Sequence, residues 1–108
     1  MWRRPATEPL LDVLEVLDRA FHQDVRPHAW EVVEAAMRSG PTVHAILDHL
    51  EETGWLTGTW QNRDRARRRF YLLTPHGAKG ARRLLATYRP GVETGSQTSL
   101  GPDPILRE

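Results

Sequence analysis

The feature that most constrains the fold is a short segment, residues 39–56, that marks its own start and end as a helix. Pro41 has a fixed φ that suits the first helical position, and Gly54 can adopt the left-handed conformation in which helices end. Between them, apolar residues at spacings of three and four form one stripe: Val43, Ile46, Leu47 and Leu50. The opposite face carries Thr42, His44, Ala45, Asp48, His49 and Glu52. Its first turn has little bulk, so this helix could approach a phosphate or the major groove of DNA, or it is an ordinary amphipathic helix with a solvated face.

Upstream of this segment, apolar residues repeat at helical spacing between Leu10 and Phe21. Leu11, Val16 and Ala20 widen the stripe beyond what a single core contact requires, so this first helix has apolar side chains on two faces. Either the second face packs against another subunit, or the surplus positions are only half buried. Residues 1–7, which precede the helix, are expected to form a flexible arm.

A second helix is expected between Arg26-Pro27, which breaks the first, and Gly40, which closes it. Its expected apolar positions are Trp30, Val33 and Met37. A tight turn at residues 38–40 then joins it to the helix that begins at Pro41. A helix, a short turn containing glycine and a second helix form a helix-turn-helix, whose second helix enters the DNA groove.

The pattern changes from helical to strand-like after Gly54. Residues 55–61 and 70–74 are rich in aromatic and β-branched side chains, which predicts two strands joined by a polar turn at residues 62–69. Pro75 begins a last helix that ends at Tyr88, and residues 89–108 are expected to be a disordered tail. Residues 8–88 therefore predict one α+β domain, mainly α: a winged helix-turn-helix with a two-stranded β-hairpin wing and a C-terminal helix.

The charge of the chain is divided unevenly. Residues 1–59 contain five arginines against ten acidic residues, a net charge of −5, whereas residues 60–90 contain nine basic residues against one acid, a net charge of +8. Five of these bases lie on the tip and return strand of the hairpin: Arg63, Arg65, Arg67, Arg68 and Arg69. Like charges this close repel one another unless a partner neutralises them, which favours a polyanionic partner over a merely solvated run of charge.

The sequence gives little support to other classes of function. It contains no cysteine, no signal peptide, and no apolar run near the roughly 20 residues of a membrane helix, so we expect a cytoplasmic location and no membrane partner. Among the five histidines, only His44 with Asp48 has the spacing of a chelating pair, and two ligands do not make a metal site. No nucleophile motif or glycine-rich phosphate loop is present, so we expect no enzyme activity and no cofactor.

Three motifs resemble those of PadR-type transcriptional regulators. Residues 28–32, His-Ala-Trp-Glu-Val, resemble the family's His-Gly-Tyr-Glu-Ile signature. Residues 40–51 resemble its recognition helix, Gly-x-Thr-[Leu/Val]-Tyr-x-x-Leu-x-x-Leu-Glu. Residues 67–77, Arg-Arg-Arg-Phe-Tyr-Leu-Leu-Thr-Pro-His-Gly, resemble its wing exit, which is the most specific match. The resemblance covers roughly residues 10–85.

This resemblance implies a homodimeric winged-helix repressor that binds a palindromic operator in double-stranded DNA. By this resemblance Thr42 and His44 would face the DNA, His28 would lie near a phosphate, and Arg67 and Arg68 would hold the backbone or the minor groove. The full set of candidate DNA-binding residues is His28, Arg38, Thr42, His44, Ala45, Arg63, Arg65, Arg67, Arg68 and Arg69. The family dimerises through a long C-terminal helix, but here Pro90 limits that helix to about four turns. Dimerisation would then depend on the first helix or be weak.

The sequence leaves two questions open. Trp30, Trp55 and Trp60 are expected to pack in the core and on the strands, or one or two of them line a cleft between subunits that accepts a small flat aromatic effector. The second question is whether the partner is DNA at all. Acidic residues on the presumed recognition helix, such as Glu51, would be repelled by phosphate, so the alternative is a winged helix that binds another regulator through its acidic N-terminal half.

Overall fold

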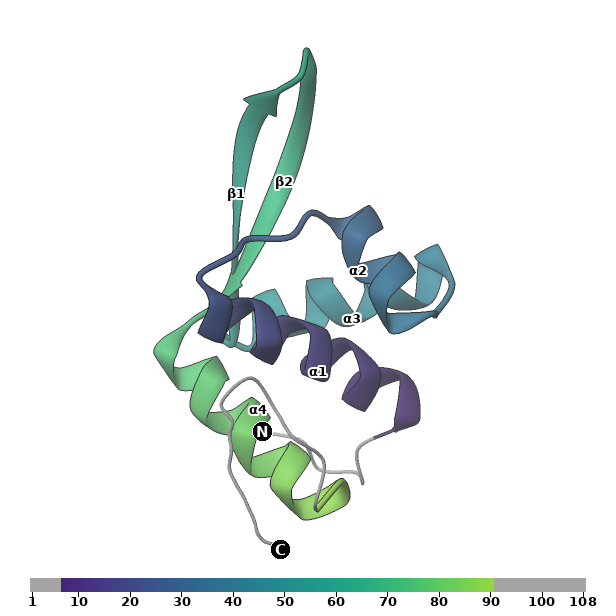
Figure 1. The fold of residues 1–108 in the computed structure, drawn as a ribbon, viewed down its shortest axis with the longest axis vertical. Helices are drawn as coiled ribbons and strands as arrows, with labels where there is room; N and C mark the ends of the chain where they lie inside the picture. Colours follow the sequence, from purple (N-terminus) through teal and green to yellow (C-terminus); the bar gives the residue numbers. More distant parts are fainter. Residues whose placement is uncertain (1–6, 91–108) are drawn as a thin grey trace, which may run out of the picture.

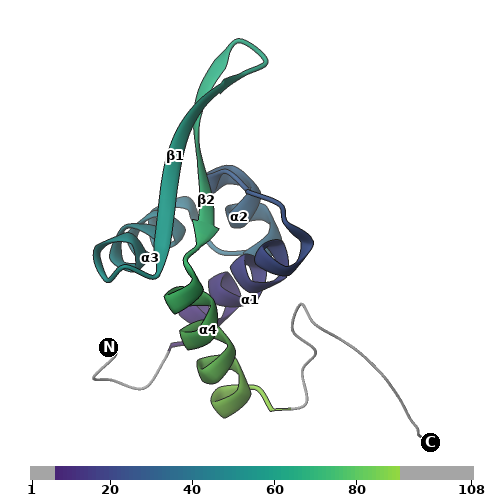
Figure 2. The same cartoon turned by 90° about the vertical axis from the view of Figure 1, so that its left-hand side faces the viewer.

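The computed structural model describes residues 7–90, so residues 1–6 of the expected arm (1–7) and residues 91–108 of the expected tail (89–108) lie outside them. The described elements are α1 (Glu8–Gln23), α2 (Ala29–Ala36), α3 (Gly40–Glu52), β1 (Leu56–Arg63), β2 (Ala66–Leu73) and α4 (Pro75–Tyr88). The helices form a body from which the β1–β2 hairpin projects, and α4 lies at the end of the body away from the hairpin tip (Figure 1, Figure 2). This arrangement confirms the predicted fold, a mainly helical winged helix-turn-helix.

Three of the helices begin in the same way, with a hydroxyl cap followed by a proline in the first turn. The caps are Thr7 for α1, Ser39 for α3 and Thr74 for α4, and each side chain accepts a backbone N–H from three residues ahead. The hydroxyl pairs a donor that a helix start leaves unpaired, and proline carries no N–H to leave unpaired. These local signals explain why the starts of α3 and α4 could be located from the sequence.

Helix α2 departs from its prediction at its end and on its buried face. It ends at Ala36 and is closed by Met37 in the left-handed conformation (φ 58°). Gly40, which was expected to close it, is instead the first residue of α3. Its buried side chains are Val32 and Ala36. Trp30 and Met37, which were expected among the apolar positions of this helix, are 60% and 87% exposed, so they do not mark its buried face. Small side chains let α2 pack closely on α1, and eight residues give too few turns for apolar spacing to identify the inner face.

Helix α1 crosses the middle of the body and packs against the other three helices and β2 (Figure 1). Its buried side chains are Leu10, Leu11, Val13, Leu14, Leu17, Asp18 and Ala20. Both apolar faces are therefore used inside one chain, and only Val16, among the surplus positions, is half buried. Leu11 and Ala20 neither await a second subunit nor stay half buried, because other elements of the same chain cover them. The apolar pattern of one helix does not show how many elements pack around it.

The hairpin is longer and its turn tighter than predicted. The strands pair antiparallel over eight residues each, from Leu56 opposite Leu73 to Arg63 opposite Ala66. The turn consists of residues 64 and 65, both left-handed with φ values of 53° and 63°, as in the two-residue turns that match the twist of paired strands. The prediction of a polar turn over residues 62–69 was therefore wrong. Charged residues are uncommon in strands, so the arginines were assigned to the turn. The outer half of this hairpin projects from the body and packs on no core, so its strands can consist of charged residues.

The base of the hairpin is fixed to α4 through Trp55. Gly54 ends α3 with a φ of 82°, as predicted, and its carbonyl accepts a hydrogen bond from Thr74 Oγ1 at 2.8 Å. The backbone N–H of Thr74 donates to the Trp55 carbonyl at 2.9 Å. A Cβ at Gly77 would lie 1.9 Å from that carbonyl oxygen, and one at Gly80 would lie 2.5 Å from the Trp55 ring. The wing is therefore seated on α4 because these two positions have no side chain.

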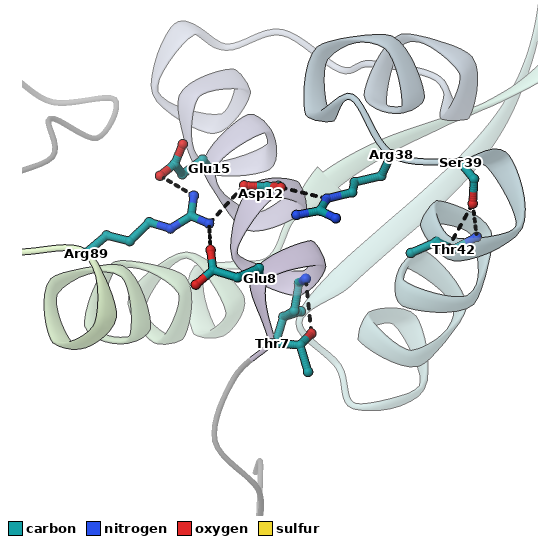
Figure 3. A network of polar contacts seen from close by, with 9 residues as sticks. Thr7, Glu8, Asp12, Glu15, Arg38, Ser39, Thr42 and Arg89 are labelled. Carbon is teal, nitrogen blue, oxygen red and sulfur yellow. Dashed lines mark hydrogen bonds and ion pairs between the residues drawn. The ribbon is translucent and has the colours of Figure 1, made fainter.

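The far end of α4 is tied to α1 by Arg89, the first residue of the expected tail (Figure 3). Its guanidinium donates to Glu15 Oε2 at 2.7 Å, to Asp12 Oδ1 at 2.9 Å and to Glu8 Oε1 at 2.5 Å. The hydrogen bond with Glu15 is the main reason why the pKa of Arg89 is raised. Burial alone would raise the pKa of Asp12, but hydrogen bonds from Arg38 and Arg89 outweigh burial and lower it. We call these five residues the arginine clamp.

Candidate nucleic-acid interface

The outer face of α3 carries the residues predicted to contact base edges. Val43, Leu47 and Leu50 are buried, as the apolar stripe predicted, and this turns Ala45 and His44 outward. The buried stripe therefore fixes which side of α3 is free to meet a partner.

The first turn of α3 holds two of these side chains in place. The hydroxyl of Ser39 accepts the backbone N–H of Thr42 at 3.4 Å and donates to Thr42 Oγ1 at 3.0 Å. Nδ1 of His44 lies 2.9 Å from the carbonyl oxygen of Gly40. Because a carbonyl oxygen only accepts, Nδ1 carries the hydrogen, and Nε2 remains for a ligand. The exposed start of the helix thus presents oriented polar groups on a surface of low bulk.

Strand alternation divides the arginines of the wing between two faces. Arg67 and Arg69 share a face with Trp60, and their guanidinium carbons lie 4.9 Å and 5.5 Å from the centre of its ring. Arg68 lies on the opposite face, where its Nη1 is 3.1 Å from Nε2 of His28 at the start of α2. The structure therefore brings His28 together with the wing, and its contact with DNA stays a prediction.

Nearer the tip, two more arginines extend the basic surface. Arg63 donates to Gln61 Oε1 at 2.7 Å and 3.0 Å and lies 4.2 Å above the ring of Phe70. Arg65 belongs to the turn and is exposed. Between this face and the loop before α2 is an open hollow of about 720 Å³, lined in part by Arg26, His28, Arg63 and Arg68. Asp24, Glu31 and Asp64 also belong to its lining, so the hollow is mixed in charge and does not by itself indicate an anionic partner.

Ion pairs separate the candidate arginines into two groups. Arg69 pairs with Glu51 of α3, with Nη2 and Oε2 2.5 Å apart, and Arg38 pairs with Asp12 at 2.8 Å. Arg38 points toward α1 and belongs to the arginine clamp, so the structure does not bring it together with the wing (Figure 3). Within residues 7–90, the remaining wing arginines form no ion pair with an acidic side chain: Arg63, Arg65, Arg67 and Arg68.

The tryptophans were largely misjudged from the sequence. Trp55 packs in the core as expected, but Trp60 is 53% exposed, like Trp30, so the packing prediction was wrong for both. The two border an open hollow of about 480 Å³ between α2, α3 and the wing, with His44 and Arg67 also in its lining. Strand alternation could have indicated this exposure, because it places Trp60 of β1 on the same face of the hairpin as Arg67 and Arg69 of β2. The alternative of a cleft between subunits involves a second chain and stays a prediction.

Within residues 7–90, no three histidine, aspartate or glutamate side chains gather closely enough to hold a metal ion. His44, from the pair singled out in the sequence, directs Nδ1 to the Gly40 carbonyl. Asp18 and His22 of α1 have the same spacing, with Oδ1 and Nε2 3.4 Å apart, and the sequence analysis overlooked them. None of the helices in residues 7–90 combines the length and apolar character needed to cross a membrane.

Residues 23–83 match the model of the transcriptional regulator PadR-like family. Among solved structures, smu.1704 from Streptococcus mutans UA159 aligns with a TM-score of 0.62 at 23% identity, over 81% of this chain and 83% of that one. MepR, a transcription regulator of the Staphylococcus aureus multidrug efflux pump MepA, aligns with a TM-score of 0.61 at 26% identity, over 75% of this chain. The alignment covers 56% of the MepR chain. A search of curated proteins gives no match.

Proposed function

Because the chain belongs to the PadR-like family of transcriptional regulators, we propose that it binds double-stranded DNA, with α3 in the major groove and the wing along the adjacent phosphates. The observation that carries this proposal is the unneutralised positive charge on the wing. Its projecting strands and turn hold four arginines that form no ion pair within residues 7–90. Mutual repulsion among them is relieved when a polyanion binds and releases its counterions.

The roles of the residues follow from their positions. Thr42, His44 and Ala45 on the first turns of α3 contact base edges and give sequence preference. Arg67 and Arg68, together with Arg63, Arg65 and His28, contact phosphates and fix the register of the protein on the duplex. This division supports a protein that selects a sequence, because only the contacts at base edges differ between sequences.

The acidic residues that motivated a protein-interaction module have partners inside the chain. Glu51, on the presumed recognition helix, pairs with Arg69, and Glu8 and Glu15 pair with Arg89. These pairs reduce the repulsion that α3 would feel near DNA, and they leave less free negative charge on the N-terminal half. Both effects favour DNA over a basic protein partner.

The DNA-bound species in this proposal is a homodimer that represses transcription from a palindromic operator. One α3 of 13 residues reaches a single half-site, whereas two copies related by a two-fold axis meet half-sites one helical turn, about 34 Å, apart. Most apolar positions of α1 are already buried, so the two-fold contact uses other surface as well. Tyr88 at the end of α4 is exposed and is available for such a contact. Light scattering at micromolar concentration tests this point: a mass of about twice 12.4 kDa is expected, and a monomer would contradict it.

The DNA contacts are tested by titrating labelled duplexes from the DNA that flanks the protein's own gene, over a range of salt concentrations. Arg67→Ala and Arg68→Ala are each expected to weaken binding to all sequences and to reduce the slope of log K against log salt by about 0.9, the value of one phosphate. Thr42→Ala and His44→Ala are expected to change which sequence is preferred.

Arg83→Ala is the matched control, because Arg83 is an exposed arginine on α4, away from the wing tip (Figure 1). It removes the same charge and should leave the slope unchanged. If the two wing variants behave like this control, the wing does not contact phosphate. A protein retained by another regulator but by no duplex at low salt would favour the interaction module.

A further inference from the structure

Arg69 occupies a different environment from its neighbours on the wing. Its side chain crosses from β2 to the last turn of α3, where Nη2 donates to Glu51 Oε2 at 2.5 Å. The side chains of Arg69 and Glu51 are 30% and 24% exposed, so both are largely covered. This hydrogen bond is the main reason why the pKa of Arg69 is raised. The pair is the direct side-chain link between the recognition helix and the middle of the hairpin.

The residue beneath this link is Gly58 on β1. A Cβ at position 58 would lie 2.4 Å from Nε and 2.7 Å from Cζ of Arg69. The glycine is not required by its backbone, since the left-handed glycine is Gly54. Gly58 therefore provides the room that the guanidinium of Arg69 occupies next to β1, within reach of Glu51.

Two aromatic residues complete the surroundings of the pair. Trp60 stands directly opposite Arg69 in the strand register, with its ring centre 5.5 Å from the guanidinium carbon. Tyr71 is buried on the same face, and burial, together with the charge of Glu51, raises the pKa of its hydroxyl. Arg69 is thus enclosed by a carboxylate, an indole and a phenol, whereas Arg67, two residues away, is exposed and forms no ion pair within residues 7–90.

We propose that Arg69 is a positioning residue: with Glu51 and Gly58 it fixes the wing relative to the recognition helix, and it does not contact phosphate. The proposal rests on the proposed DNA binding, because its consequence is that the wing arginines meet phosphates at a set distance from the groove-reading turn of α3. The backbone of Pro27 and His28 holds β2 at Tyr71 and Phe70, on the side of α2. The Arg69–Glu51 pair joins the next position of β2 to α3 itself, so it sets the distance between the hairpin and the recognition helix.

The geometry can be tested without DNA. The chain has no cysteine, so Ala45→Cys on α3 and Asn62→Cys near the wing tip, both exposed, give two unique sites for spin labels. Pulsed electron paramagnetic resonance should give a narrow distance distribution for the otherwise unchanged protein and a broader one when Arg69→Gln or Glu51→Gln is added. Equal distributions would overturn the positioning role, whether or not the protein binds DNA.

A pair of acidic variants distinguishes positioning from phosphate contact by the sign of the effect. Glu52 neighbours Glu51 on α3 but is exposed and forms no ion pair within residues 7–90. Glu52→Gln removes one negative charge near DNA and should leave affinity equal or slightly higher. Glu51→Gln should lower affinity about three- to tenfold, because the link is lost. If Arg69 contacted phosphate, Glu51→Gln would free it and tighten binding at least as much as Glu52→Gln does.

Two further variants separate charge from geometry. Arg69→Gln should weaken binding while keeping the salt slope of the unchanged protein, whereas a lost phosphate contact would lower the slope by about 0.9. Gly58→Ala keeps every charge but displaces the guanidinium, so it should weaken binding about as much as Glu51→Gln. A reduced slope for Arg69→Gln, or unchanged affinity for Gly58→Ala, would contradict the proposal. If the unchanged protein binds no duplex, the proposed function fails, and the label distances still decide the positioning role.

Discussion

The arginine clamp and the wing differ in how their positive charges are neutralised. At the end of α4, Arg89 is surrounded by Glu8, Asp12 and Glu15, so one cation meets three carboxylates of α1. On the wing, five arginines have Glu51 as their one ion-pair partner within residues 7–90, and it is taken by Arg69. The clamp is therefore complete within the chain, and the wing is not.

This difference indicates what each region contributes. A charge that is already paired and partly covered contributes to the stability of the fold, and its removal leaves its partners without a counter-charge. An exposed, unpaired charge adds little to stability and interacts over a distance with whatever approaches. Variants in the body are therefore expected to alter unfolding, and variants in the wing to alter DNA binding.

The largest effect on stability is expected where the wing is seated on the body. Gly77→Ala should lower the free energy of unfolding by about 3 kcal/mol, because the new Cβ would lie 1.9 Å from the Trp55 carbonyl oxygen and the backbone would have to move. Urea denaturation measures the change. Gly40→Ala is the control, since a Cβ there meets nothing within 4 Å, and it should change stability by less than about 0.5 kcal/mol. Equal effects at the two positions would contradict the packing.

Loss of the clamp should come next. Arg89→Ala removes hydrogen bonds to three carboxylates and should lower the free energy of unfolding by about 2 kcal/mol. Arg83→Ala, on an exposed position of α4, should have almost no effect on unfolding. Neither variant should alter the salt slope of DNA binding. A reduced salt slope for Arg89→Ala would contradict the assignment of Arg89 to the stability of the body alone.

The arginine clamp should also make the free energy of unfolding depend on pH in the acidic range. The pKa of Asp12 is lower in the folded protein than its usual value of 3.8, so the folded state favours the ionised carboxylate. This contribution is fully present above about pH 4 and is lost as the pH falls through the folded pKa. Chemical denaturation at pH 5 and pH 3 should therefore show a larger loss for the unchanged protein than for Asp12→Asn. Equal losses of stability in the two proteins would contradict a lowered pKa of Asp12 in the folded state.

The smallest effect on stability is expected in the wing. Arg67→Ala should change the free energy of unfolding by less than about 0.5 kcal/mol, because the residue is exposed and loses mainly a contact with Trp60. The same variant is expected to reduce the salt slope of DNA binding. A marked loss of stability would mean that Arg67 contributes to the folded structure and is not free for DNA.

Local chemistry made much of the fold predictable. The hydroxyl caps, the prolines after them and Gly54 set the limits of α3 and α4, and the stripe of α3 identified its buried face. These signals act over a few residues, so they can be read in one stretch of chain. The candidate site was predictable to the same extent: the outer face of α3 and the arginine-rich hairpin.

The errors lie where the outcome depended on other elements. Trp30 and Trp60 have large aromatic side chains of the kind that usually pack in a core. Their exposure is decided by how α2 packs on α1 and by the projection of the hairpin. Likewise, the apolar width of α1 left two alternatives, a second subunit or half-buried positions, whereas three helices and a strand of the same chain cover most of it. Periodicity reports that a face is apolar and does not report what covers it.

By itself, the sequence determined the helix-turn-helix, the hairpin and the local excess of positive charge. Only the tertiary structure decided which of those charges are free. Arg38 and Arg69 were assigned to DNA with the rest, but they meet Asp12 and Glu51, which lie 26 and 18 positions away, and Arg89 meets Glu8 across 81 positions. An ion pair depends on distance in space, and side chains this far apart in the sequence come within reach of one another only when the chain has folded.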